Sequence, residues 1–231
     1  MTNSMPRTKP EPLTKFYNEE WDKLEVGIDE AGRGPLFGRV YTAAVILPKD
    51  EEFNYEWLKD SKKFSSEKKI VEVANYIKDN VLAWNVTFND EKNIDKINIR
   101  QAVLSSMHDS VRGVMKDKEK EYFLLVDGND FKPYMRYEND MFLPVEHQCI
   151  EGGDNKYCAI AAASILAKTE RDKYIQELCE ENPELKEKYG IHKNKGYGTK
   201  EHLVGISNHG ISKWHRKTYG MQISDSPLLF I

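Results

Sequence analysis

Alternation of short apolar runs with longer amphipathic stretches constrains the fold of this chain more than any other feature. Four short runs are rich in β-branched and aromatic residues and predict strands: KLEVGIDEA (23–31), RVYTAAVILP (39–48), VLAWNVTF (81–88) and EYFLLVDGND (121–130). Two longer stretches repeat apolar residues at helical spacing and predict helices within 60–80 and 89–118, and the stretch 158–181, rich in small residues, predicts a third helix. Strands that alternate with helices are typical of α/β proteins, in which helices cover a central sheet.

The stretch 60–80 gives the most detailed local prediction. Ser65 or Ser66 is suited to cap a helix, because a serine hydroxyl can accept a hydrogen bond from a free backbone N–H group. The buried face of this helix is predicted to carry Ile70, Val73, Ala74 and Ile77.

The length and composition fit one main domain with two tails. The chain has 231 residues, of which 39% are hydrophobic and 31% charged, which suits one core and a soluble surface. Residues 1–22 place prolines among Lys, Glu and Asn and predict a flexible N-terminal tail. The main domain is expected to span 23–220, and a C-terminal tail 221–231.

Membrane segments and disulfides are not expected. No apolar run approaches the ~20 residues that a membrane-spanning helix needs, and the N-terminal residues hold no apolar signal-peptide core. The three cysteines, Cys149, Cys158 and Cys179, form no CxxC pair and are expected to be reduced packing residues. We therefore expect a cytoplasmic monomer.

Acids close two of the predicted strands. Asp29 and Glu30 end the first, and Asp127 ends the fourth. Neighbouring side chains on a strand point to opposite faces, so Asp29 and Glu30 converge only if the chain leaves the sheet there, which the following glycines would permit. Functional residues of α/β proteins gather where strands end, so all three acids share one pocket if the two strands are neighbours.

A fourth acid, Asp154, lies on a glycine loop before a helix rich in small residues, which can pack closely against a sheet. Crowded carboxylates raise one another's pKa and cost stability unless a cation neutralises them. A site of oxygen ligands without thiolates favours Mg²⁺ or Mn²⁺. For each acid alone, a helix cap or a surface turn remains the alternative.

Charge is unevenly distributed along the chain. The formal net charge is -4, but the segment from Lys186 onward holds eight Lys or Arg against three Asp or Glu. A basic C-terminal part could bind phosphates while the acidic body binds cations, although a lysine-rich solvated surface is the alternative. The histidines of this part have no metal-ligand spacing and are expected to cap, hydrogen-bond or contact phosphate: His192, His202, His209 and His215.

Six successive segments together resemble the ribonuclease HII family, the type 2 ribonucleases H. They are GIDEAGRGPLFG, DSKKFS, LLVDGN, GGDNKYCAIAAASILAKTERD, NKGYGT and EHLVGISNHGISKWHRKTYG, and they span about residues 24–220. The resemblance implies a ribonuclease H-like fold, with a mixed sheet flanked by helices and a helical C-terminal extension. The main domain, 23–220, would then be the catalytic domain, including the basic C-terminal region.

The resemblance also implies roles for particular residues. The family's four metal-site acids, which are its catalytic residues, fall on Asp29, Glu30, Asp127 and Asp154. The segment whose backbone contacts the ribose 2′-hydroxyl, a group that DNA lacks, falls on Gly32, Arg33 and Gly34. Tyr197 matches a tyrosine that packs against the sugar at the RNA–DNA junction, and Lys62 matches a lysine near the scissile phosphate.

The implied activity is that of a metal-dependent endoribonuclease, with Mg²⁺ or Mn²⁺ as the cofactor. It would cleave RNA in RNA/DNA hybrids and on the 5′ side of ribonucleotides embedded in duplex DNA, leaving 3′-hydroxyl and 5′-phosphate ends. One alternative is another nuclease of the same fold that acts on DNA, and a second is an inactive hybrid-binding protein. The ribose-reading segment argues against the first, and the complete set of acids argues against the second.

Two features depart from the family pattern or lie beyond it. Gly152 stands where the family usually has a lysine, two residues before Asp154, and one positive charge is thereby lost. The C-terminal sequence SDSPLLFI resembles short peptides that dock into replication sliding clamps, although such a tail could instead pack on its own domain.

Overall fold

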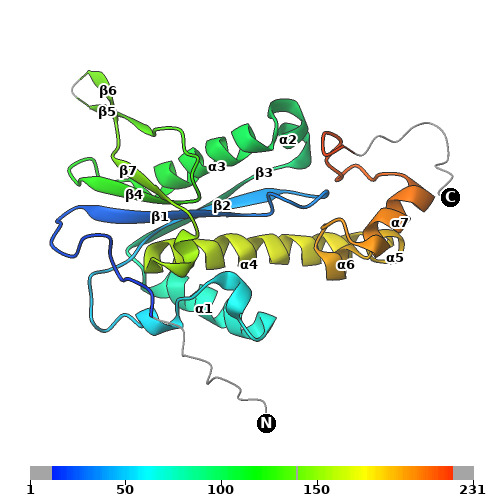
Figure 1. Ribbon diagram of the computed structural model, residues 1–231, viewed down its shortest axis with the longest axis horizontal. Helices are drawn as coiled ribbons and strands as arrows, with labels where there is room; N and C mark the ends of the chain where they lie inside the picture. The colour runs from blue at the N-terminus through cyan, green and yellow to red at the C-terminus, as the bar shows by residue number, and fades with distance from the viewer. Residues whose placement is uncertain (1–11, 139, 221–231) are drawn as a thin grey trace, which may run out of the picture.

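The structure, a computed structural model, describes residues 12–138 and 140–220. Its centre is a five-stranded mixed sheet with the order β3-β2-β1-β4-β7 (Figure 1). β1 pairs antiparallel with β2 and parallel with β4; β2–β3 is antiparallel and β4–β7 parallel. The strand bounds are β1 Leu24–Ala31, β2 Val40–Ile46, β3 Ala83–Asn89, β4 Tyr122–Asp127 and β7 His147–Ile150.

Helices cover both faces of the sheet (Figure 1). One face carries α1 (Glu67–Asn80) and α4 (Cys158–Glu181), and the other carries α2 (Glu91–Ile97) and α3 (Ile99–Val114). Beyond α4 lie three short helices, α5 (Glu184–Tyr189), α6 (Ile191–Asn194) and α7 (Lys200–His209). The predicted mixed sheet with flanking helices and a helical C-terminal extension is confirmed.

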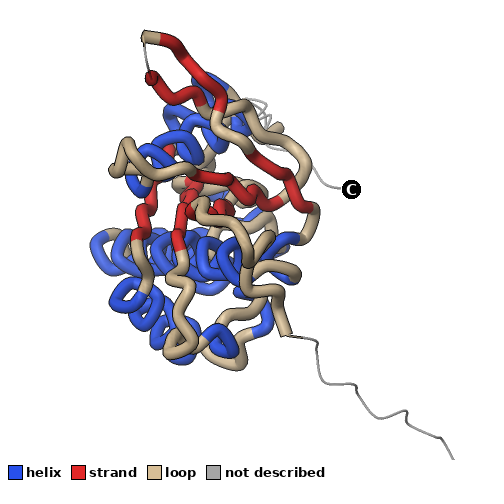
Figure 2. The backbone as a smooth tube through the Cα atoms, turned by 90° about the vertical axis from the view of Figure 1, so that its left-hand side faces the viewer, coloured by secondary structure: helices blue, strands red, loops and turns tan. Residues whose placement is uncertain are grey.

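A small antiparallel hairpin stands away from the main sheet (Figure 2). It consists of β5 (Met135–Glu138) and β6 (Met141–Pro144). It connects the end of β4 to the start of β7, so it lies toward the end of the sheet where β4 begins. Three 3₁₀ turns complete the structure: Tyr55–Trp57, Ser61–Lys63 and Gly153–Asn155.

Helix α1 forms as its sequence predicts. The hydroxyl of Ser66 accepts a hydrogen bond of 3.2 Å from the N–H group of Lys69 at the start of the helix. The buried residues of the helix are the four expected ones, Ile70, Val73, Ala74 and Ile77. This face packs into the core between α1, α4 and β2.

Helix α4 approaches the sheet unusually closely because both surfaces lack bulky side chains at the contact. A Cβ atom added to Gly27 in β1 would lie 2.1 Å from the carbonyl carbon of Ala159. The following alanines, Ala161, Ala162 and Ala163, are fully buried. The start of α4 is therefore fixed directly beneath β1.

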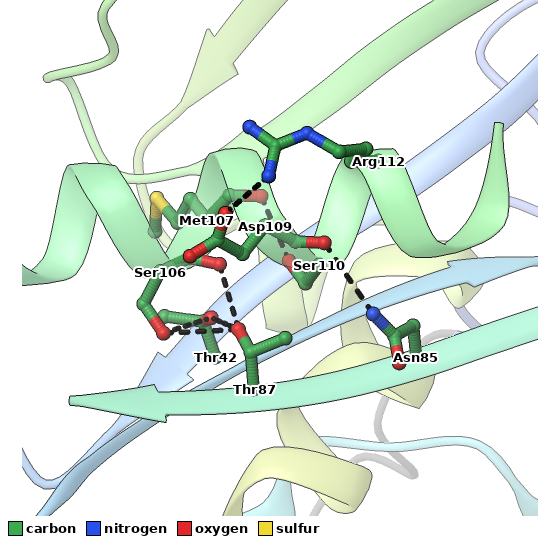
Figure 3. A network of polar contacts seen from close by, with 8 residues as sticks. All are labelled: Thr42, Asn85, Thr87, Ser106, Met107, Asp109, Ser110 and Arg112. Atoms are coloured by element: carbon green, nitrogen blue, oxygen red, sulfur yellow. Dashed lines mark hydrogen bonds and ion pairs between the residues drawn. The ribbon is translucent and has the colours of Figure 1, made fainter.

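Helix α3 is held on the opposite face by apolar packing and by a buried hydroxyl network (Figure 3). Thr42 of β2 donates to Ser106 of α3 at 3.0 Å, and Thr87 of β3 donates to the carbonyl of Ser106 at 2.7 Å. Because each hydroxyl is partnered, these polar groups are buried without a large cost and fix the register of the helix on the sheet.

The predicted flexible tail over 1–22 needs correction for residues 12–22. The N–H group of Thr14 donates to the carbonyl of Lys156, and its carbonyl accepts from Cys158. Tyr17 stacks on Phe123 with ring centroids 5.2 Å apart, and Leu13 and Phe16 pack against the core. These contacts bury apolar residues that composition alone assigns to a flexible tail. Residues 1–11 and the predicted C-terminal tail, 221–231, lie outside the described residues.

The remaining expectations concern thiols and membranes. The three cysteines are free; Cys158 and Cys179 are buried and Cys149 is half-buried. Within the described ranges, no helix is both long and apolar enough to cross a membrane.

Candidate active site

The end of the β1–β4 pair forms the base of the site. The parallel pairing runs from Leu24–Tyr122 to Ile28–Val126 and stops there, while β1 continues to Ala31 paired only with β2. The next residues on the two strands are Asp29 and Asp127. They follow in register, so both point to the face that α4 covers.

Asp29 and Glu30 reach the same cavity from opposite faces of β1. The chain stays in the sheet between them, since β1 includes both residues, and the two carboxylates do not converge on one point. Glu30 points toward α3 and also borders a smaller cavity lined by Val103 and Met107. The notch where β4 separates from β1 lets both carboxylates line one cavity of about 320 Å³.

Asp154 reaches this cavity from the turn that precedes α4. Asp127 fixes the turn by accepting a hydrogen bond of 2.7 Å from the N–H group of Gly153. A Cβ atom on Gly153 would lie 2.5 Å from the terminal methyl group of Ile160, so this side chain would have to move to admit one. The cavity is thus lined by all four acids that the sequence singled out: Asp29, Glu30, Asp127 and Asp154.

Burial and mutual repulsion disfavour the charged forms of these acids. Asp29 is 5% exposed, and its burial, together with the charges of Glu30 and Asp127, raises its pKa well above the usual range. Burial is also the main cause that raises the pKa of Glu30 and of Asp127. The guanidinium of Arg33, 3.6 Å from Glu30, acts in the opposite direction on the pKa of Glu30.

Cationic side chains lie near the acids, but the ion pairs that they form with Glu30 and Asp154 are long. The ammonium group of Lys62 lies 3.9 Å from Asp154 and is 81% exposed, so it is free to contact a ligand. Asp172 of α4 forms an ion pair of 2.7 Å with Lys168. Both Lys168 and Asp172 line the same cavity.

The segment Gly32–Gly38 forms one rim of the cavity and is held by two buried arginines. Gly32 has a φ of +93°, and a Cβ atom there would lie 2.1 Å from Arg171. Arg171 donates to the carbonyls of Phe37, Arg39 and Lys195. From the other side, the fully buried Arg216 donates to the carbonyls of Gly32, Arg33, Pro35 and Gly38. The backbone of Gly32, Arg33 and Gly34 is therefore rigidly placed at the cavity.

Tyr197 faces this rim from the C-terminal extension. Its ring is half-exposed, and a Cβ atom on Gly34 would lie 3.6 Å from it. The adjacent Gly196 accepts a backbone hydrogen bond of 2.9 Å from Leu36. A flat aromatic surface and an open glycine backbone thus border the same space, which suits a sugar ring.

The cavity lining also includes side chains that the sequence does not single out, among them Ser61, Ser164, Lys168 and Lys195. Ser164 sits among the buried alanines of α4, and its hydroxyl lies 3.1 Å from that of Ser61. The one available signal was the presence of Ser61 and Ser164 within the DSKKFS and AAASILAK segments. Neither hydroxyl is distinctive by residue type.

The donor set fits a hard divalent cation, because it consists of carboxylate oxygens alone. Across residues 12–138 and 140–220, however, no three His, Cys, Asp or Glu side chains are close enough together to form a metal-binding group. The four acids line one cavity without converging on a single point. The carboxylates would have to move closer together to share an ion.

Comparison with known proteins places this geometry in a family. The family model described as Ribonuclease HII matches residues 26–222. Ribonuclease HII of Bacteroides fragilis is 44% identical over 209 residues, covering 90% of this chain and 94% of the relative. Ribonuclease HII of Parabacteroides distasonis is 45% identical over 200 residues, covering 87% and 92%.

Solved structures share the fold. The ribonuclease H2 of Pyrococcus horikoshii OT3 superposes with a TM-score of 0.64 at 19% identity, covering 85% of this chain and 93% of that one. The PCNA:RNase HII complex of Archaeoglobus fulgidus gives a TM-score of 0.64 at 23% identity, with 87% and 97% covered. Bst-RNase HIII in complex with Mn²⁺ gives 0.53 at 18% identity, with 71% and 56% covered.

Proposed function

This chain belongs to the ribonuclease HII family and is an endoribonuclease acting on RNA/DNA hybrids, and we propose that it also cleaves on the 5′ side of ribonucleotides embedded in duplex DNA. The products are a 3′-hydroxyl and a 5′-phosphate carried by the ribonucleotide. Its task in the cell is the removal of ribonucleotides and RNA from DNA.

One observation carries this proposal. A single cavity is lined by four carboxylates and bordered by the glycine backbone at 32–34 and by the ring of Tyr197. Carboxylates alone suit many phosphodiesterases. A rigid backbone segment beside an aromatic ring adds recognition of the ribose, because its N–H and carbonyl groups can bind the 2′-hydroxyl.

The residues have distinct roles in this mechanism. Asp29, Glu30, Asp127 and Asp154 would hold Mg²⁺ or Mn²⁺, which when bound would polarise the phosphoryl oxygens and activate water. Gly32, Arg33 and Gly34 present their backbone to the ribose, and Tyr197 packs against the sugar at the junction. Lys62 and the Arg33 guanidinium bind phosphate oxygens, and the exposed position of Lys62 allows it to do so.

The decisive experiment uses three duplexes of one sequence: one with a single internal ribonucleotide, one with a continuous RNA strand, and one of DNA only. Each is incubated with Mg²⁺, with Mn²⁺ or with chelator, and the product ends are identified. We expect cleavage of the first two duplexes, with either metal and not with chelator. Cleavage of the DNA duplex would favour a DNA nuclease, and binding without cleavage would favour an inactive hybrid-binding protein.

A sliding clamp is the second partner that we propose, bound through the C-terminal sequence SDSPLLFI. The Archaeoglobus relative is described in complex with PCNA, but this tail of our chain lies outside the described residues. Deleting residues 226–231 should remove clamp binding and leave cleavage of short duplexes unchanged. If the deletion instead lowers the melting temperature and the full chain binds no clamp, the tail is structural.

A further inference from the structure

Two fully buried histidines lie directly behind Tyr197. His202, on α7, and His215, in the segment after α7, are both 0% exposed, and their Nε2 atoms are 3.0 Å apart. The Nδ1 atom of His202 is 2.9 Å from the carbonyl oxygen of Tyr197. The Nδ1 atom of His215 lies 2.9 Å from the backbone nitrogen of Ser212 and 2.8 Å from its hydroxyl.

The partners at the two ends determine where the protons are. A carbonyl oxygen only accepts, so Nδ1 of His202 carries a proton and donates to Tyr197. The N–H group of Ser212 only donates, so Nδ1 of His215 is bare and accepts. A neutral His215 then carries its proton on Nε2 and donates it to the bare Nε2 of His202. The successive hydrogen bonds therefore all donate in one direction, from Ser212 through the two histidine rings to Tyr197.

A third proton does not fit this arrangement. Protonating Nε2 of His202 would place two N–H groups against each other, and protonating Nδ1 of His215 would oppose it to the N–H group of Ser212. The side chains that face the rings carry no charge that would stabilise an added proton; they are Phe37 from the 32–38 segment and Tyr189 from α5. The hydroxyl of Tyr189 donates to Gly210, while His209 of α7 faces the Tyr189 ring.

Charged groups near the pair are directed elsewhere. Arg216, next to His215, sends its guanidinium to the carbonyls of the 32–38 segment. Glu201, next to His202, lies beside Gly190. Among the described residues, no carboxylate forms an ion pair with either histidine. Burial lowers the pKa of His202, and burial together with the neighbouring His202 ring lowers the pKa of His215 to about 4.

We propose that the neutral His202–His215 pair is a positioning device that fixes the carbonyl of Tyr197 and so aims its ring at the substrate sugar. The proposal rests on the sugar-reading role proposed above for Tyr197. The Tyr197 carbonyl also accepts a hydrogen bond of 2.7 Å from the N–H group of Thr199, so two donors set its direction. Of these two donors, only His202 is a buried side chain.

Two substitutions at one position separate positioning from general stability. In His202→Asn the side-chain NH₂ group replaces Nδ1, so the bond to Tyr197 is kept and the contact with His215 is lost. In His202→Gln the amide reaches the place of Nε2, so the contact with His215 is kept and the bond to Tyr197 is lost. His209→Asn, on the exposed surface of the same helix, is the control.

The readout is the ratio of kcat/KM on a duplex with one ribonucleotide to that on a continuous hybrid. We expect His202→Gln to lower this ratio about three- to tenfold relative to His202→Asn, the effect of one hydrogen bond, mainly through kcat. Melting temperatures should fall similarly in both variants, and His209→Asn should match the parent protein. Equal ratios for the Asn and Gln variants would overturn the proposal.

An NMR measurement decides the matter independently of catalysis. In the full chain labelled with ¹⁵N-histidine, His202 should be the Nδ1–H form and His215 the Nε2–H form, both unchanged between pH 7.5 and about 5.5, where an ordinary histidine becomes charged. The Thr199 amide, which reports on the Tyr197 carbonyl, should shift in His202→Gln and not in His202→Asn. If the parent protein cleaves no ribonucleotide, the proposed function fails, and the Thr199 amide shift alone then tests whether the histidine pair positions the Tyr197 carbonyl. Titration of either histidine ring near pH 6.5 would refute the neutral pair.

Discussion

At the scale of single residues, the site contains some residues that can be predicted from the sequence and others that cannot. The four acids stand out because each follows an apolar strand or a glycine turn, where carboxylates have no packing role. Ser164 and His202 do not stand out, since serine in a helix and histidine near a turn are common. Their importance arises from contacts with Ser61 and His215, and residue type alone does not specify these partners.

Asp29→Asn and Asp127→Asn should abolish turnover while the fold persists. In the proposed site, each change removes a charged oxygen ligand of a metal that would contribute several kcal/mol to transition-state stabilisation, so we expect kcat to fall by about two orders of magnitude or more. Steady-state cleavage in Mg²⁺ measures this, with circular dichroism as the check on folding. Cleavage near the parent rate by either variant would contradict the site assignment.

The same Asp29→Asn variant should be the more stable protein in chelator at neutral pH. The folded-state pKa of Asp29 is raised, so its contribution to stability is present below the unfolded value of about 3.9 and is lost as pH rises through the raised value. The melting temperature of the variant should therefore exceed that of the parent protein at pH 7, and the difference should vanish near pH 3.5. A constant difference across this range would argue against charge repulsion.

Arg33→Ala and Tyr197→Ala should impair cleavage at a lone ribonucleotide more than cleavage of a continuous hybrid. A lone ribonucleotide presents one sugar and its phosphate to the Tyr197 ring and the Arg33 guanidinium, whereas a hybrid presents many. We expect a relative loss of about tenfold, the effect of one or two ligand contacts. Lys193→Ala, an exposed change in the basic segment, is the control. The same substrate profile for all three variants would refute the sugar-reading role.

At the scale of elements, periodicity predicts where a helix or strand lies better than what it touches. The cap and buried face of α1 follow from its sequence because both are local. β1 lies within the predicted range 23–31, but the sequence does not show that its last three residues pair with β2 after pairing with β4 has ended. Residues 12–22 were assigned to a tail because their contacts, with Lys156, Cys158 and Phe123, come from distant parts of the chain.

Gly27→Ala tests the close approach of β1 and α4. The added carbon would lie 2.1 Å from the backbone of Ala159, so the helix must move away, and we expect a loss of about 1–3 kcal/mol or more in the free energy of unfolding. Urea denaturation measures this loss. Gly198→Ala is the matched control, because its added carbon meets the flexible end of Leu36 at 3.2 Å. Equal stability of the two variants would show that β1 and α4 can accommodate the added carbon without a loss of packing.

At the scale of the whole molecule, the carboxylate cavity and the basic C-terminal segment lie toward the same end of the sheet. Asp29 and Asp127 lie where β1 and β4 end, and the basic C-terminal segment lies beyond α4, as Figure 1 shows. The exposed lysines Lys118 and Lys120 precede β4 and so lie toward the opposite end of the sheet. A molecule that is acidic overall can therefore offer phosphates a basic surface at one end.

Salt dependence of duplex binding tests this polarity. The double change Lys193→Ala and Lys200→Ala should weaken binding and flatten the dependence of log K on log salt by about one to two units, as two phosphate contacts are lost. Lys118→Ala with Lys120→Ala removes the same charge from the opposite end and should leave the slope unchanged. If both double variants flatten the slope equally, binding follows net charge and not its placement.

The hydrogen bonds of Arg216 have a consequence for biosynthesis. Its guanidinium fixes carbonyls 178 to 184 positions earlier in the chain, so the rim beside Asp29 cannot assume its final form until residue 216 has left the ribosome. Such distant contacts close late in folding, because the entropy of a long loop must be overcome first. A nascent chain therefore carries the first carboxylates of a nuclease for most of its synthesis, yet it lacks the fixed surface that we propose contacts the ribose.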